Sequence, residues 1–112
     1  MTRKDKLDRL AHLADLKATL AKSGAAQVAA EADALSGRIR IALEDRRAMA
    51  AQTPDPITAR AHATWLRHCD QTLRALRSEQ ARLRVRLDAG LDRARLEEGR
   101  RQVLEKLKHQ AS

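Results

Sequence analysis

Aromatic and large apolar residues are scarce in this chain. It has no phenylalanine and no tyrosine, and Trp65 is its only aromatic residue. Leu, Ile and Val together number 22 in 112 residues, close to the level below which a highly charged chain is expected to be disordered. Alanine, also present 22 times, favours helix but buries little area. We therefore expect an apolar seam between helices instead of a globular core, in an elongated, marginally stable molecule that gains order from a partner.

Cysteine and long apolar runs are scarce as well. The single cysteine, Cys69, excludes an internal disulfide and fits a reducing compartment. No apolar stretch follows the charged first residues, so no secretory signal is predicted. The longest apolar run, Ala48–Ala51, is far too short to cross a membrane. The sequence predicts a cytoplasmic protein without a membrane span.

The two prolines, Pro54 and Pro56, stand close together near the middle of the chain. Neither fits a helix interior, because proline lacks the N–H and crowds the preceding turn. Thr53 and Asp55, however, are good N-cap residues, and proline suits a first helical turn. We therefore predict an all-α fold, a long antiparallel helical hairpin in which the two helices form a coiled coil. Residues 1–112 would form this single hairpin, with helix one at about 3–52, the turn at 53–57 and helix two at about 58–109.

Helix one is expected to begin at Thr2, with Asp5 completing a capping box. An apolar stripe at three- and four-residue spacing is expected to face helix two. Its members are Leu7, Leu10, Leu13, Leu16 and Leu20, followed by a weaker stretch and then by Leu35, Ile39 and Leu43. Gly24 and Gly37 leave alternatives open: a hinge that breaks the helix into a bundle of shorter pieces, or close packing against a neighbouring helix. A continuous helix is favoured, because no proline or polar loop accompanies either glycine.

Helix two carries four heptads of a coiled coil. Position a is taken by Leu66, Leu73, Gln80, Leu87 and Ala94, and position d by Cys69, Leu76, Leu83 and Gly90. Cys69 is interpreted as a small apolar seam residue. After Gly90 the leucines and valines no longer follow this stripe, which predicts a change of phase.

A turn near residue 55 would place residue i of helix one opposite residue 110 − i of helix two. Large apolar residues would then meet at both ends of the hairpin. Under this register Leu43 faces Leu66, Leu35 lies near Leu73 and Leu76, Leu20 approaches Leu87 and Leu91, and Leu7 approaches Val103 and Leu104.

The sequence contains no catalytic signature, and we predict that the protein is not an enzyme and needs no cofactor. The four histidines lack the spacing that brings metal ligands onto one helix face. The four glycines are isolated, so no phosphate-binding loop is present. Neighbouring acidic pairs are flanked by arginines and are interpreted as solvated surface.

The formal net charge is +8, and most of it lies in the second half of the chain. Two features there are candidates for partner binding: Trp65, either a seam residue or an exposed anchor, and an arginine strip, either a solvated face or a binding surface. The candidate partner-binding residues are Trp65, Arg60, Arg67, Arg74, Arg77, Arg84, Arg100 and Arg101. Nucleic acid is a less favoured partner, because one tryptophan offers little base stacking and acids interrupt the arginines.

The leucine stripe Leu7–Leu20, the coiled-coil run Trp65–Leu91 and the basic ending Gly99–Lys108 together resemble the FliJ family of flagellar type III export proteins. The resemblance implies a coiled-coil rod of the bacterial flagellum that inserts into the ring of an export ATPase, contacts the export gate protein and escorts chaperones. The two chain ends would be seated in the ATPase ring, and the tip would face the gate or the chaperones. The alternatives are a small basic nucleic-acid-associated protein and a generic coiled-coil scaffold or dimerisation module, including a homodimer.

Overall fold

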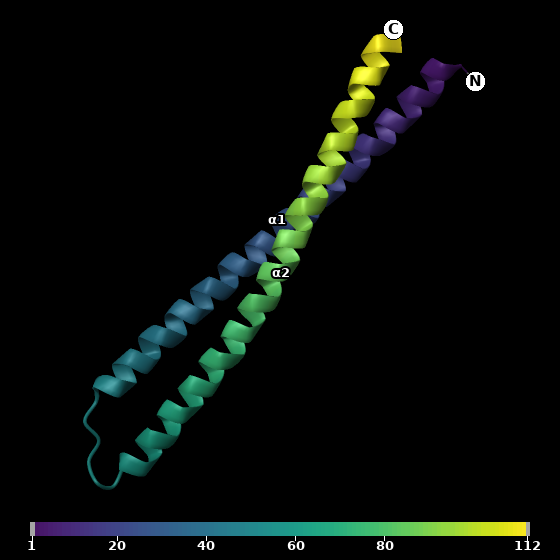
Figure 1. Ribbon diagram of the computed structural model, residues 1–112. Helices are drawn as coiled ribbons and strands as arrows, with labels where there is room; N and C mark the ends of the chain where they lie inside the picture. Colours follow the sequence, from purple (N-terminus) through teal and green to yellow (C-terminus); the bar gives the residue numbers. More distant parts are fainter. Residues whose placement is uncertain (1, 112) are drawn as a thin grey trace. The chain divides into compact units, whose positions relative to one another are not determined.

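The computed structural model describes residues 2–111 as two long helices, α1 (Arg3–Ala51) and α2 (Ala59–Ala111), joined by a short turn (Figure 1). The two helices pack against each other as an antiparallel hairpin, which confirms the predicted fold class. The turn covers residues 52–58, so α2 begins one residue later than predicted and continues two residues further. Gly24 and Gly37 both lie inside α1, which is continuous, and neither glycine has a neighbour that an added Cβ would touch. Both the hinge and the close packing considered for these glycines are therefore wrong.

Side-chain caps define where each helix starts. At the start of α1, the Thr2 hydroxyl accepts a hydrogen bond from the Asp5 N–H, and the Asp5 carboxylate accepts one from the Thr2 N–H, both at 3.2 Å. This reciprocal pair is the capping box that the sequence predicts. In the turn, Asp55 Oδ1 accepts hydrogen bonds from the N–H groups of Ile57 and Thr58. The bonds from Thr58 are the main reason that the pKa of Asp55 is lowered.

The contacts divide the hairpin into two compact units. The chain-end unit comprises Met1–Ala29 and Val85–Ser112, of which residues 2–29 and 85–111 are described. The tip unit comprises Ala30–Arg84. Both chain ends therefore belong to one unit (Figure 1).

The tip unit has the leucine-rich seam that heptads predict. Its buried apolar side chains are Leu35, Ile39, Leu73, Leu76 and Leu83. The a and d positions assigned in α2, including Gln80 and Cys69, are all buried or half-buried. In a continuous coiled-coil helix, residues seven positions apart lie on the same face, so the residues at intervals of seven before Leu35 and Ile39 also face α2.

The chain-end unit has a seam of alanine instead of leucine. Its buried apolar residues are Ala11, Ala14, Ala18 and Ala25. The leucines between them lie outside the seam: Leu10, Leu13, Leu16 and Leu20 are exposed. The prediction that the leucine stripe faces α2 is therefore wrong for these four leucines, although Leu7 is half-buried and the later members Leu35 and Ile39 are buried in the tip unit. The cause is the heptad period of a continuous helix, because the face that buries Leu35 and Ile39 in the tip unit reaches the alanines when it is followed back along α1.

The phase of α2 does not change after Gly90. Burial continues at three- and four-residue spacing, and the seam positions are Gly90, Ala94, Glu97, Arg101, Leu104 and Lys108. The sequence suggested a phase change because charged residues occupy seam positions there, while Leu96, Val103 and Leu107 lie outside the seam.

The register of the pairing also differs from the prediction. In the chain-end unit Ala25 lies across from Gly90, and Asp15 pairs with Arg101; in the tip unit Arg46 pairs with Asp70. Residue i of α1 therefore lies across from a residue near 115 − i, not 110 − i. Leu7 approaches the position of Lys108, so large apolar residues do not meet at the chain ends. The turn is asymmetric, because α2 already begins at Ala59 but first contacts α1 at His62. At this contact the His62 imidazole Nε2 lies 2.7 Å from the carbonyl oxygen of Met49.

Candidate protein-interaction surfaces

One edge of the chain-end unit is closed by ion pairs. Arg101, at a seam position, contacts the carboxylates of Glu98 at 2.8 Å and Asp15 at 3.8 Å, and Lys22 reaches Glu98 at 2.9 Å. These contacts hold the pKa of Glu98 down at about 2, first through the hydrogen bond from Arg101 and then through that from Lys22. The same hydrogen bond, which Arg101 donates to the Glu98 carboxylate, raises the pKa of Arg101. Lys22 and Glu98 both occupy position e of their heptads, so this edge is called the e-side.

The opposite edge of the chain-end unit carries a shallow groove, called the g-side groove. It is lined by Lys17, Leu20, Ala21, Gly24, Ala25 and Val28 of α1 and by Gly90, Arg93 and Glu97 of α2. Its floor consists of alanines and glycines, and Lys17 and Arg93, both at position g, stand on its two sides. The groove is therefore apolar at its base and positively charged along its rims.

Glu97 is an acid at a seam position in this groove. Its residue is only 4% exposed, and its Oε1 accepts a hydrogen bond from Arg100 at 3.2 Å. Its other oxygen, Oε2, is buried and has no hydrogen-bond partner among the described residues. A buried carboxylate oxygen without a donor costs free energy, so Glu97 destabilises the seam at this position.

Apolar side chains also lie on the outer surface of both helices in the chain-end unit. On α1 they are Leu10, Leu13, Leu16 and Leu20, the last of them 71% exposed. On α2 the exposed residues Leu96 and Val103 flank Gly99 in a second shallow pocket, with Leu107 one turn beyond Val103. An unburied apolar surface shared by two adjacent helices is typical of a site that binds another apolar surface.

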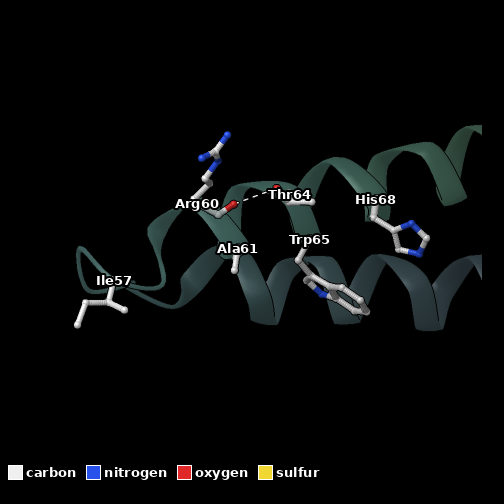
Figure 2. Close-up of a pocket in the computed structure, with 6 residues that line it drawn as sticks. All are labelled: Ile57, Arg60, Ala61, Thr64, Trp65 and His68. Atoms are coloured by element: carbon white, nitrogen blue, oxygen red, sulfur yellow. Dashed lines mark hydrogen bonds between the residues drawn. The ribbon is translucent and has the colours of Figure 1, made fainter.

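Trp65 lies on an open surface of the tip unit. It is 48% exposed, and it lines a pocket with Ile57, Ala61 and His68. Figure 2 shows the side chains of Trp65 and Ala61 on one side of α2 and Arg60 on the other, with Ile57 in the turn that precedes the helix. The indole ring centroid is 5.5 Å from that of the His68 imidazole. The structure thus places Trp65 outside the seam, beside the seam residue Leu66.

The predicted arginine strip lies on the outside of α2 in the tip unit. All five of its arginines, Arg60, Arg67, Arg74, Arg77 and Arg84, are exposed. Arg67 donates a hydrogen bond to the Thr64 hydroxyl at 3.2 Å. Asp70, which interrupts the strip, bonds to Arg46 of α1 through its carboxylate, and this hydrogen bond lowers the pKa of Asp70 and raises that of Arg46.

The other two candidate residues, Arg100 and Arg101, do not join this strip. Arg101 is half-buried in the ion pairs of the e-side, and Arg100 is exposed beside the g-side groove. The seven candidate arginines therefore do not form one surface.

Within residues 2–111 the structure has no group of His, Cys, Asp and Glu side chains arranged to bind a metal ion. Cys69 is a free, half-buried thiol at its predicted seam position. Over the same residues neither helix contains a stretch apolar enough to cross a membrane.

The g-side groove and the exposed leucines were not predicted from the sequence. The signal was present in the alanine spacing, because Ala11, Ala14, Ala18, Ala21 and Ala25 alternate by three and four residues. The sequence favours the leucines as seam residues instead, because a larger buried side chain stabilises a seam more than alanine does.

No protein-family model, curated protein or solved structure matches this chain.

Proposed function

We propose that this protein is a non-enzymatic coiled-coil rod that binds other proteins along its outer surface. The observation that carries the proposal is the exposed apolar surface of the chain-end unit, where Leu13, Leu16 and Leu20 lie outside the seam. Each leucine is already partly covered in the free chain, so a partner that covers the rest of it would contribute about 1–2 kcal/mol of binding free energy before the costs of association. The alanine seam supports the same conclusion, because the larger apolar residues are left for outside contacts.

The specific form of the proposal is a FliJ-like component of flagellar type III export that contacts the export ATPase and the gate. It rests on the resemblance described above, and the hairpin fold is compatible with it. In that role the chain-end unit would be the part seated in the ATPase ring. The exposed leucines would then lie at the interface with the ring.

A pull-down with the full chain from cytosol tests the general proposal, and a binding measurement with purified export ATPase tests the specific one. Recovery of the ATPase would support the specific form. Recovery of nucleic acid alone would overturn the protein-binding proposal. A salt series separates these outcomes, since nucleic-acid binding falls steeply with salt while an apolar contact persists.

A pair of matched variants locates the contact. Leu13→Gln with Leu16→Gln removes apolar surface from the chain-end unit and should weaken partner binding by on the order of tenfold to a hundredfold. Ile41→Gln is the control, because Ile41 is equally exposed but belongs to the tip unit. Equal binding by both variants would show that the exposed leucines are not the contact.

A further inference from the structure

The charges of the chain-end unit are segregated between its two faces. The ion pairs of Lys22 with Glu98 show that the e positions of both helices share one edge. The groove lined by Lys17 and Arg93 shows that the g positions share the other. Positions c and f lie beyond g on each helix, so the residues at c, f and g of both helices form one continuous surface. This surface is called the basic apolar face.

The basic apolar face combines the exposed leucines with cations from both helices. From α1 it receives Arg3, Lys6, Arg9 and Lys17, and from α2 it receives Arg86, Arg93, Arg100 and Lys106. All eight are exposed. Among the described residues of this unit Asp92 is the one exposed acid at these positions, and its carboxylate pairs with Arg95 at 3.2 Å. The acids Asp5, Asp8, Asp15, Asp88, Glu98 and Glu105 occupy positions b and e instead.

From this arrangement we infer that the g-side groove binds an amphipathic helix of a partner protein whose apolar stripe is flanked by acidic side chains. The inference rests on the proposed protein-binding function and names the chemistry of the partner. The small residues Ala21, Gly24 and Gly90 in the groove let a third helix approach the backbone closely. Leu20 and Val28 supply apolar contacts, and Lys17 and Arg93 stand where the acidic flanks would lie.

Charge also decides against two other occupants. A two-fold contact of this face with a second copy would bring Lys17, Arg93 and their neighbouring cations against the same cations, and like charges repel. A nucleic acid would be attracted to the cations but would leave the leucines between them uncovered. A surface with both properties fits a partner that has both acidic and apolar groups.

The test uses the full chain and two designed helical peptides with identical leucine positions, one with glutamate flanks and one with lysine flanks. Binding is followed by the fluorescence anisotropy of labelled peptide at physiological salt. The glutamate peptide should bind and the lysine peptide should not. Lys17→Glu with Arg93→Glu should weaken binding of the glutamate peptide by on the order of tenfold and favour the lysine peptide.

Arg47→Glu with Arg82→Glu is the matched control, because it makes the same charge change at exposed positions of the tip unit, one on each helix. Binding by this control should equal that of the unchanged chain, and circular dichroism checks that both variants fold. The inference is overturned if the two double variants bind the glutamate peptide equally. It is also overturned if the chain binds vesicles of anionic phospholipid but not the peptide, or if it dimerises through this face in sedimentation.

The same variants separate this inference from the function on which it rests. If the natural partner recovered by pull-down binds the Lys17→Glu, Arg93→Glu chain as well as the unchanged chain, protein binding stands and the acidic-helix inference fails. If no protein partner is recovered, the proposed function fails first.

Discussion

Gly90 is the position where the packing of the chain-end seam can be measured most directly. A Cβ added there would lie 3.6 Å from the Ala25 Cα and 3.7 Å from its Cβ, which is ordinary van der Waals contact. Gly90→Ala should therefore fit without moving either helix. It should gain about 1 kcal/mol from helix propensity and up to about 0.8 kcal/mol from the partly buried methyl group.

Gly24→Ala separates these two contributions. An added Cβ at Gly24 has no neighbour within 4 Å, so this variant should gain only the propensity share, about 1 kcal/mol. Urea unfolding of the full chain, followed by circular dichroism, gives both free energies. A shift of about 4–8 °C in melting temperature is expected for each kcal/mol in a chain of this size. If Gly90→Ala destabilises the protein while Gly24→Ala stabilises it, the helices lie closer together at this point than the structure places them, and the alanine seam is wrong.

Three further predictions test the seam and its ion pairs by urea or thermal unfolding. Leu35→Ala should lower the free energy of unfolding by about 2–5 kcal/mol, because Leu35 is 2% exposed. Leu20→Ala should change it by less than about 0.5 kcal/mol, because Leu20 lies outside the seam. A larger effect of Leu20→Ala than of Leu35→Ala would show that the leucine stripe, and not the alanines, faces α2. Ala18→Leu should destabilise by about 1–3 kcal/mol, because Ala18 is 1% exposed and a larger side chain would push the helices apart; an unchanged melting temperature would contradict this packing. Glu98 has a lower pKa when folded, about 2, than its ordinary 4.5, so its stabilising contribution is present above pH 4.5 and is lost as the pH falls towards 2. Glu98→Gln should flatten this part of the acid denaturation profile. An identical profile in both proteins would show that the ion pairs of Glu98 do not stabilise the fold.

The hairpin and the position of its turn could be predicted because they depend on local chemistry. Pro54 and Pro56 interrupt the helix wherever they stand, and Asp55 caps the next one from within the turn. The heptads of α2 could also be predicted as far as Gly90, since each seam position there is apolar or small apart from Gln80.

The face of α1 that meets α2 in the chain-end unit could not be found by counting leucines. Two apolar stripes compete there, one of leucine and one of alanine, and the choice depends on the other helix. Arg101 occupies a seam position of α2 and lies 3.8 Å from Asp15, which is beside the alanines, in addition to its closer contact with Glu98 on its own helix. Turning α1 to bury Leu13 would take Asp15 away from Arg101 and remove this ion pair between the two helices. Pairing between helices is a long-range property, so a pattern within one helix does not determine it.

The candidate binding residues show the same limit. Arg100 and Arg101 are neighbours in the sequence, yet Arg100 bonds to Glu97 of the g-side groove and Arg101 belongs to the e-side ion pairs. Composition alone leaves two interpretations of Trp65 open, a seam residue and an exposed anchor, and the structure shows that its side chain is exposed.

The alanine seam has a consequence for how the molecule opens. The alanines that α1 contributes to the seam remove little apolar surface from water, so the two arms near Ala11 and Ala18 can separate at a lower free-energy cost than the arms near Leu35 and Leu76. Amide protons of the chain-end unit should therefore exchange with solvent sooner than those around Leu73 and Leu76. A partner that covers the outer leucines would slow this exchange. The exchange rate of these amide protons would therefore indicate whether a partner is bound to the chain-end unit.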